Sequence, residues 1–340
     1  MKILVYDDNP IGGGHQVMAC HGIAALAAAP SANVVCMIHP KNQLLINRLS
    51  LLENIQILDA DPSRLKTIQP DLVLCIQGDI AQCTKGIHAA VKAKIECISY
   101  LAIPHRLTDM GATFGALRDL KNHPLFNRPD RYITLSESMK KMLKERGTKK
   151  EICVVPNGIP RPPAPKRTSR ESAFTIGLVG RIEFNQKQQD FFVRTVLQHS
   201  QSFSNCKILF IGNGPDEQKL RRLIQGNDTF NLLPWQENME AIYARIDLLA
   251  IPSRYEGVPL VMLEALARGI PVMGSRCDGM LEILPADWTF TPEDSSALAA
   301  TFSTVRNHTQ AAMESLQNRI ITDYSMKAFK QNFVQALIKT

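Results

Sequence analysis

Two glutamates, Glu256 and Glu264, lie eight residues apart where the sequence passes from a predicted strand to a predicted helix. The apolar run Leu248–Ile251 indicates a buried strand, and Pro259 suits the first turn of the helix that follows. Glu256 therefore precedes this helix, and Glu264 is expected to face out of its second turn. Carboxylates accept hydrogen bonds from hydroxyl groups, so the pair suits a ligand rich in hydroxyls; a purely structural role is the alternative.

The start of the same helix is predicted to bind an anion. The backbone around Val258–Val261 offers N–H groups that have no partner inside the helix, and the helix dipole adds positive potential there. A nucleotide-sugar combines phosphates with hydroxyls. It therefore fits carboxylates that flank an anion site.

A second candidate for phosphate binding follows the predicted strand Phe174–Val179. Gly180 and Arg181 come directly after this strand, and Lys187 comes six residues later, just before a predicted helix. Arginine can bind a phosphate through two parallel hydrogen bonds, and lysine acts as a point charge. The two cations suit a diphosphate; a pair of solvated surface cations is the alternative.

A glycine-rich loop, residues 9–16, follows the first predicted strand and contains Gly12, Gly13 and Gly14. Glycines let the backbone approach an anion closely, and the start of the next helix favours negative charge. The dinucleotide-binding pattern is absent, because its third glycine would fall at Val17, and no phosphate-binding lysine completes a Walker loop. We expect contact with phosphate or sugar; a bare tight turn is the alternative.

Short apolar runs alternate with amphipathic stretches in both halves of the chain, which predicts parallel sheets covered on both faces. The strands expected are Ile3–Tyr6, Val34–Ile38, Ile55–Leu58, Leu72–Ile76, Ile95–Leu101, Tyr132–Leu135, Ile152–Val155, Phe174–Val179, Lys207–Ile211, Phe230–Leu233, Leu248–Ile251 and Pro271–Met273. The helices expected include Gln16–Ala28, Gln43–Leu52, Ile80–Ala93 and Glu137–Arg146. The C-terminal part, from about Ser295, is predicted to be helical with a break near residues 323–325.

Proline and basic residues crowd the segment between the halves, which predicts an interdomain linker. We therefore expect a first α/β domain over residues 1–160, to which the C-terminal helix of about 325–340 belongs. The linker is expected over residues 161–172 and a second α/β domain over residues 173–324. Ligands of such sheets bind beyond the carboxyl ends of the strands, so the two edges are expected to face each other across a cleft.

The composition is that of a globular protein: 340 residues with 45% apolar residues, 21% charged residues and a net charge of +7. Disorder is excluded, and no apolar run approaches the roughly 18–20 residues of a membrane-spanning helix. The N-terminus turns acidic at Asp7, unlike a secretory signal, so a cytoplasmic location is expected. The eight cysteines form no Cys-x-x-Cys pair and are expected to be small buried residues in a reducing compartment.

Together these motifs resemble the family-4 retaining glycosyltransferases, which have the GT-B fold. The most specific match is the Glu-x7-Glu string, which ends in Gly269-Ile270-Pro271. The same order of motifs continues with Val155–Ile159, Gly180-Arg181 with Lys187, Ile211–Pro215 and Ala250–Ser253. The resemblance covers nearly the whole chain and is strongest over residues 150–285.

The resemblance implies two Rossmann-like domains that move a sugar from a nucleotide-diphosphate-sugar to a glycan, lipid-linked or small-molecule acceptor, with retention. Catalytic roles would fall to Glu256, His105, Arg181 and Lys187. The donor would be bound by Gly13, Gly14, Gly180, Arg181, Lys187, Gly257, Val258, Pro259, Leu260, Glu264 and Trp235. The acceptor side would include Gly12, His15, Gln16 and His105, and Glu282 matches a family position near the same cleft.

No metal and no permanently bound cofactor are expected, because the single Asp-x-Asp string, Asp59–Asp61, is interpreted as a loop. No nucleic-acid partner is expected either. The basic segment Lys140–Lys150 is a hypothetical contact with the anionic inner face of a membrane, against the alternative of a solvated helix face. Two other functions stay open: a nucleotide-sugar epimerase of the same fold, and a catalytically silent donor-binding subunit. The silent subunit is suggested by Gln16, where the family often has glutamate.

Overall fold

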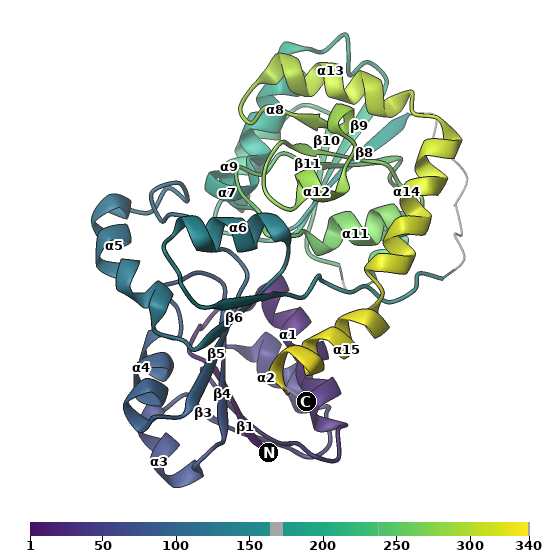
Figure 1. Ribbon diagram of the computed structural model, residues 1–340. Helices are drawn as coiled ribbons and strands as arrows, with labels where there is room; N and C mark the ends of the chain where they lie inside the picture. Colours follow the sequence, from purple (N-terminus) through teal and green to yellow (C-terminus); the bar gives the residue numbers. More distant parts are fainter. Residues whose placement is uncertain (164–172, 237, 339–340) are drawn as a thin grey trace. The chain divides into compact units, whose positions relative to one another are not determined.

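The structure is a computed structural model that describes residues 1–163, 173–236 and 238–338 (Figure 1). The chain forms two compact units: Met1–Gly158 together with Met326–Thr340, and Ile159–Ser325. The predicted boundaries lie at residues 160, 172 and 324. Residues 164–172 of the predicted linker lie outside the described residues.

The first unit is built on a parallel seven-stranded sheet of order β3-β2-β1-β4-β5-β6-β7. Its strands are β1 (Lys2–Asp7), β2 (Asn33–Ile38), β3 (Ile55–Asp59), β4 (Leu72–Gln77), β5 (Glu96–Leu101), β6 (Arg131–Thr134) and β7 (Glu151–Val154). Every residue of the central strand β4 is buried, whereas the edge strand β3 is partly exposed. The continuous apolar runs of the sequence therefore mark strands that are covered on both faces.

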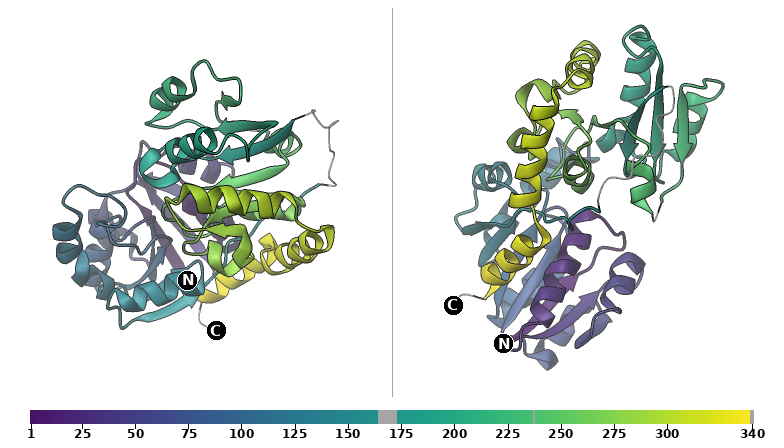
Figure 2. Two further views of the ribbon diagram at one scale, coloured as in Figure 1. Left: turned by 90° about the horizontal axis from the view of Figure 1, so that it is seen from above. Right: turned by 90° about the vertical axis from the view of Figure 1, so that its right-hand side faces the viewer.

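The helices of the first unit include one from the far end of the chain. They are α1 (Gly14–Ala27), α2 (Gln43–Leu49), α3 (Leu65–Ile68), α4 (Thr84–Ala93), α5 (Gly115–Asn122), α6 (Glu137–Glu145) and α15 (Met326–Leu337), with 3-10 turns at Pro62–Arg64 and His123–Asn127. The helix α15 lies against α1 (Figures 1 and 2). A Cβ on Gly22 would lie 2.4 Å from the Phe333 ring, so only glycine permits this contact. Arg131 on β6 donates hydrogen bonds to the carbonyls of Ala336, at 2.8 Å, and Leu337.

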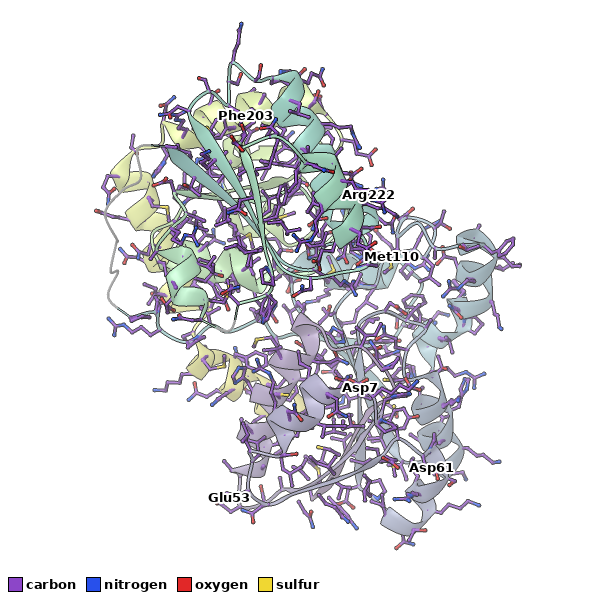
Figure 3. The ribbon with its side chains drawn as sticks, turned by 180° about the vertical axis from the view of Figure 1, so that it is seen from behind. Asp7, Glu53, Asp61, Met110, Phe203 and Arg222 are labelled. Atoms are coloured by element: carbon purple, nitrogen blue, oxygen red, sulfur yellow. The ribbon has the colours of Figure 1, made fainter. Side chains whose placement is uncertain are left out.

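The second unit has a parallel six-stranded sheet of order β10-β9-β8-β11-β12-β13. Its strands are β8 (Phe174–Val179), β9 (Cys206–Ile211), β10 (Phe230–Leu233), β11 (Leu248–Ile251), β12 (Val272–Ser275) and β13 (Thr289–Phe290). Its helices are α7 (Phe184–Lys187), α8 (Gln189–Gln198), α9 (Glu217–Ile224), α10 (Met239–Tyr243), α11 (Leu260–Ala267), α12 (Met280–Ile283), α13 (Ser295–Arg306) and α14 (Gln310–Asp323), with a 3-10 turn at Ala286–Trp288. Phe203 stacks on Phe302 with ring centroids 4.6 Å apart, inside this unit (Figure 3).

Several predicted boundaries are wrong. The helix expected from Ile80 begins at Thr84, because residues 80–83 form a turn, and the helix expected to reach Leu52 ends at Leu49. The C-terminal break predicted near residues 323–325 is confirmed, since α14 ends at Asp323 and α15 begins at Met326. A second break at residues 307–309 was not predicted; there the Thr309 side chain caps α14 by accepting a hydrogen bond from the Ala312 N–H.

Six of the eight cysteines are buried, and Cys153 and Cys277 are half-buried. The Asp-x-Asp string lies at the edge of the first unit, where Asp61 caps the Pro62–Arg64 turn through the Ser63 N–H (Figure 3). The string is thus part strand end and part loop. Asp7, in contrast, lies inside the same unit and is fully buried.

Candidate active site

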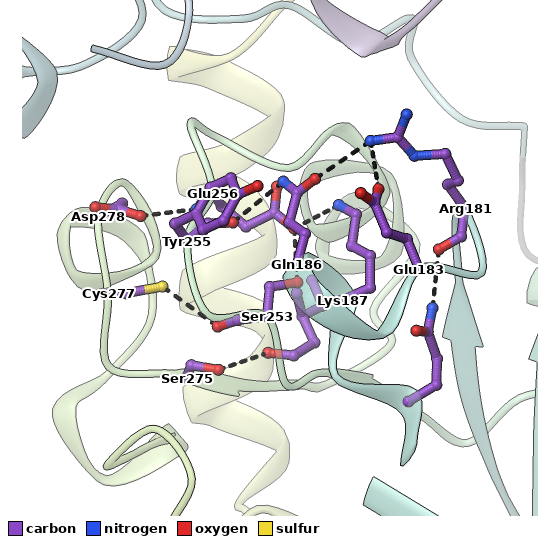
Figure 4. A network of polar contacts seen from close by, with 12 residues as sticks. Arg181, Glu183, Gln186, Lys187, Ser253, Tyr255, Glu256, Ser275, Cys277 and Asp278 are labelled. Carbon is purple, nitrogen blue, oxygen red and sulfur yellow. Dashed lines mark hydrogen bonds and ion pairs between the residues drawn. The ribbon is translucent and has the colours of Figure 1, made fainter. Parts of the chain in front are cut away.

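An ion pair joins the two main motifs of the second unit (Figure 4). Lys187 ends the short helix α7, and Glu256 lies in the loop between β11 and α11. The lysine Nζ is 2.5 Å from Oε1 of Glu256, and Ser253 Oγ donates a hydrogen bond of 2.7 Å to the same oxygen. Glu256 is only 6% exposed, so its charge depends on these two partners.

The loop that carries Glu256 is held from the neighbouring strand β12. Asp278 has a positive φ of 51°, and its carboxylate accepts a hydrogen bond of 2.7 Å from the Glu256 N–H. A Cβ on Gly279 would lie 2.4 Å from the Gly257 carbonyl oxygen, so the two loops touch through their backbones. The Cys277 thiol donates to the Ser253 carbonyl, and burial raises the pKa of that thiol. These contacts fix where the Glu256 carboxylate lies.

Arg181 has a different carboxylate partner from Lys187. Its side chain is about half exposed and pairs with Glu183 at 2.5 Å, whereas Lys187 pairs with Glu256. Gln186 lies between the two pairs, because its amide oxygen accepts from Arg181 at 3.5 Å and its amide nitrogen donates to the Tyr255 carbonyl. Gln186 thus links Arg181 to the backbone beside Glu256, and each of the two cations already holds a carboxylate.

Glycines bring two strand ends of this unit together. Gly180 has a φ of 145°, and space is open where its Cβ would stand. Gly212 has a φ of 147°, and its Cβ would lie 2.0 Å from the Gly180 carbonyl oxygen. The close approach of the two loops beyond β8 and β9 therefore requires glycine at position 212.

Glu264 does not face out of α11 as expected. Its carboxylate accepts a hydrogen bond of 2.5 Å from the hydroxyl of Tyr243, and the residue is half-buried. Burial raises the pKa of this carboxyl, and the Tyr243 hydrogen bond opposes that shift. Arg268 stacks on the Tyr243 ring at 4.6 Å and pairs with Glu240. Pro259 is the N-cap of α11 and not part of its first turn, so Leu260 begins the helix.

The glycine loop of the first unit is an N-terminal cap of α1. Gln16 accepts a hydrogen bond of 2.6 Å from the Gly13 N–H and donates one of 2.6 Å to Asp7. Burial raises the pKa of Asp7 to about 6. His15 is half-buried, its Nε2 is buried without a hydrogen-bond partner among the described residues, and burial lowers its pKa to about 4. Gly12 packs against Leu44, whose Cβ would lie 2.8 Å from an added Cβ.

The remaining predicted residues are more scattered. His105 is buried in the loop that follows β5. Trp235 is 54% exposed in the loop after β10, and its backbone N–H donates to the side-chain oxygen of Asn213 at 2.9 Å. Thus the structure brings Lys187 and Glu256 into direct contact, while Glu264 and Trp235 have separate partners. Gly12–Gln16 and His105 belong to the first unit and the other predicted residues to the second.

Sequence reasoning assigned no role to Glu183, Gln186, Ser253 or Asp278. The sequence offers a signal for Asp278 alone, which lies after a predicted strand and before Gly279. Aspartate tolerates positive φ, so it is a residue type suited to such a tight turn. Among residues 1–163, 173–236 and 238–338, no group of three or more His, Cys, Asp or Glu side chains could hold a metal ion. No helix of the described part of the chain is long and apolar enough to cross a membrane.

Known structures match this fold over the full chain. The Anabaena protein HepE, solved with UDP and glucose, covers 100% of both chains with a TM-score of 0.81 at 17% identity. The lipopolysaccharide outer core galactosyltransferase WaaB covers 99% of both chains with a TM-score of 0.73 at 17% identity. The two parallel Rossmann-like sheets define the class as the GT-B fold of glycosyltransferases, as predicted.

Within that class, residues 173–308 match the family described as Glycosyl transferases group 1. The lipopolysaccharide 1,6-galactosyltransferase of Escherichia coli K12 is 27% identical over 254 residues, which is 71% of this chain and 66% of the relative. An uncharacterized glycosyltransferase of Haemophilus influenzae is 26% identical over 151 residues, or 44% of this chain and 42% of the relative. The chain thus spans about two fifths to two thirds of the length of these relatives.

Together the family match, the relatives and the fold support the assignment of this chain to the glycosyltransferases.

Proposed function

We propose that the protein transfers a sugar from a nucleotide-diphosphate-sugar to a glycan, lipid-linked or small-molecule acceptor, with retention and without a metal ion. The observation that carries this proposal is the contact between Lys187 and the buried carboxylate of Glu256. A donor of this class has a phosphate directly attached to a hydroxyl-bearing sugar. A cation and a carboxylate side by side match that junction in both charge and hydrogen-bonding capacity.

The bond that breaks lies between the anomeric carbon and the diphosphate, and the departing diphosphate gains negative charge. Lys187 and the backbone N–H groups at the start of α11 are fixed positive groups suited to that charge. The ion pair with Glu256 holds the lysine in place, so the protein's own contacts orient this cation. Arg181, paired with Glu183 at the surface, is assigned to the same diphosphate and must exchange that carboxylate for phosphate.

Glu256 is assigned to the hydroxyls of the transferred sugar and Glu264 to those of the ribose. Tyr243 already donates to Glu264, which leaves the rest of that carboxylate's accepting capacity for a ligand. The uridine nucleotides bound to HepE support a uridine donor as the first to test. Trp235, exposed in the loop after β10, is assigned to the base.

The acceptor is proposed to be a glycan or a lipid-linked glycan, since relatives include lipopolysaccharide galactosyltransferases. Gly12, Gly13, Gly14, His15, Gln16 and His105 of the first unit are assigned to the acceptor and the donor phosphate. Retention rests on the family resemblance, because no motif side chain is an obvious nucleophile. Proton NMR of the first product from an α-linked donor tests it, and a β-linked product would refute it.

Transfer without a metal follows from the cations assigned to the leaving group. Activity should persist in excess chelator; loss of activity that magnesium or manganese restores would contradict the proposal. The decisive experiment is a product assay with UDP-sugars in the presence and absence of acceptors. Sugar transfer supports the proposal, whereas a rearranged nucleotide-sugar without acceptor identifies an epimerase, and tight donor binding without turnover identifies a silent subunit.

A further inference from the structure

Helix α5 carries its large apolar side chains on the outside of the first unit. Phe114 at its N-cap, Leu117 and Leu120 have 77%, 67% and 75% of their surface exposed. Their spacing of three residues places them along one side of the helix, and we call these three residues the α5 stripe. Single exposed apolar residues are ordinary, but three on one helix side form a patch that needs an explanation.

The opposite side of α5 is polar, and it is this side that contacts the protein. Gly115 is buried, and its Cβ would lie 2.6 Å from the Thr108 backbone. The Asp119 carboxylate accepts hydrogen bonds from the N–H groups of Leu107, at 2.9 Å, and Thr108, at 3.1 Å, and pairs with Arg146 at 3.0 Å. A surface helix of a globular protein normally turns its apolar side inward; α5 does the reverse. Its orientation is fixed by these contacts.

The surroundings of the α5 stripe are positively charged. Residues 106–128 contain four cations and two carboxylates, and one of these, Asp119, is neutralised by Arg146. The four cations, Arg106, Arg118, Lys121 and Arg128, are all exposed. Apolar side chains flanked by arginine and lysine are the composition of helices that lie in the surface of an anionic membrane.

The basic segment Lys140–Lys150 adjoins this surface. The Asp119–Arg146 pair joins α5 to the end of α6, and the Asn127 side chain donates to the Gly147 carbonyl at 2.9 Å. Arg146 is buried in that pair and over the Phe126 ring, so it is not one of the exposed cations, contrary to the sequence-based expectation. The lysines of Lys140–Lys150 extend the positively charged surface around the α5 stripe. The stripe in turn supplies apolar side chains for contact with lipid.

We propose that α5 docks the first unit onto an anionic lipid surface. The α5 stripe enters the boundary between headgroups and acyl chains, and the neighbouring cations contact lipid phosphates. A second copy of the chain is a poorer occupant, because a two-fold contact would set the four cations of one copy against those of the other. This surface binding does not depend on the proposed transferase activity.

The test is cosedimentation of the full chain with vesicles of equal parts phosphatidylcholine and phosphatidylglycerol, beside vesicles of phosphatidylcholine alone. Wild type should bind the anionic vesicles at low salt and much less at about 1 M salt, where the Debye length is about 3 Å. The double variant Leu117→Ser/Leu120→Ser should lower the fraction bound at least about tenfold. Arg118→Gln/Lys121→Gln should lower it several-fold and weaken its salt dependence.

The matched control is Leu51→Ser. Leu51 is 84% exposed on the same unit and precedes the edge strand β3, whereas α5 follows β5, so this variant should bind vesicles like wild type. Both leucines of the double variant are exposed, so its circular dichroism and its binding of UDP without vesicles should be unchanged. UDP binding also separates this proposal from the transferase assignment, since either can fail alone.

Three results would overturn the proposal. Wild type could fail to sediment with anionic vesicles at low salt, or Leu51→Ser could lose as much binding as the double variant. The third result combines two measurements. Neither wild type nor the double variant would bind vesicles, and sedimentation velocity without lipid would show that wild type self-associates whereas the double variant is monomeric. The α5 stripe would then be an interface between copies.

Discussion

The carboxylate of Asp278 accepts a hydrogen bond of 2.7 Å from the backbone N–H of Glu256, across 22 positions of sequence. The bond ties the loop after β12 to the loop after β11. Asp278 makes this bond with a φ of 51°, which only a few residue types tolerate. Since Glu256 is assigned to the reacting sugar, this contact sets the position of a group on which turnover depends.

We expect Asp278→Gly to lower kcat about tenfold or more, with a smaller change in the donor KM. Glycine keeps the positive φ but removes the acceptor, and a misplaced carboxylate costs most in the transition state. Steady-state kinetics with varied UDP-sugar measure the two constants. Asp278→Asn is the control, because asparagine tolerates this φ and its side-chain oxygen can accept the same hydrogen bond. Equal losses in both variants would show that the hydrogen bond is not what matters.

Removing the Lys187 charge should lower turnover by about 10²–10³-fold, the usual effect of losing one donor to a developing charge. Arg181→Ala should act in the same direction. The control is Arg254→Ala, which removes an exposed pair with Glu293 near the same loop and should leave activity within about twofold. Activity of Lys187→Ala and Arg181→Ala within about threefold of wild type would refute the assignment of this site.

Lys187→Met should also lower stability, because it leaves Glu256 buried with only the Ser253 hydroxyl as an observed side-chain partner. We expect a loss of about 1–3 kcal/mol in the free energy of unfolding, and Glu256→Gln in the same chain should recover much of it without restoring turnover. Both tryptophans, Trp235 and Trp288, belong to the second unit, so urea unfolding followed by tryptophan fluorescence reports on it. No recovery in the double variant would show that the cost of Lys187→Met is steric.

Tyr243 should tune Glu264 as a ligand for the ribose. Glu264→Ala should raise the donor KM with little change in kcat, since ribose hydroxyls do not change charge during the reaction. Tyr243→Phe removes the hydrogen bond that lowers the pKa of Glu264, so the loss of donor affinity on acidification should begin at a higher pH. The control is Glu240→Gln, which removes the carboxylate that pairs with Arg268. It tests whether any substitution near Glu264 moves the loss of donor affinity to a higher pH. An unshifted pH profile in Tyr243→Phe would separate the tyrosine from donor binding.

The buried Asp7 should make the first unit less stable as pH rises. Its folded pKa of about 6 lies above the ordinary aspartate pKa of 3.8, so the native state holds the proton more tightly than the unfolded chain. The stabilisation is complete below about 3.8 and is lost as pH rises towards 6. Relative to Asp7→Asn, wild type should lose about 1–3 kcal/mol across this window and then stay constant. Urea unfolding followed by far-ultraviolet circular dichroism measures this difference, and a flat difference would contradict the shifted pKa.

Strands buried on both faces were predictable from sequence, and helices with unusual orientation were not. Phe174–Val179 and Leu248–Ile251 have the predicted bounds, because buried runs of mainly apolar residues have few alternatives in parallel sheets. The strand Thr289–Phe290 has two residues, too few to show a pattern. The helix α5 was missed because its apolar side faces outward and its Phe114 cap has no recognisable capping side chain.

The candidate site was predictable in its motifs and not in its pairings. Local sequence placed Lys187 and Glu256 at strand and helix ends. Which carboxylate Lys187 meets depends on how β8 and β11 pack, so its pairing with Glu256 and the turn of Glu264 towards Tyr243 were not foreseen. A hydrogen bond such as that from Glu256 to Asp278 joins residues with no periodic relation and leaves no sequence pattern.

The packing of α15 against Gly22 and Arg131 sets an order on how this protein is made. The first unit needs residues 326–337, which leave the ribosome only after the whole second unit. Until then the surface of α1 that receives Phe333 is open to water and to chaperones. Synthesis therefore completes the second unit first, although the first unit begins the chain. A stop codon after Ser325 would spare the later unit and leave the earlier one unfinished.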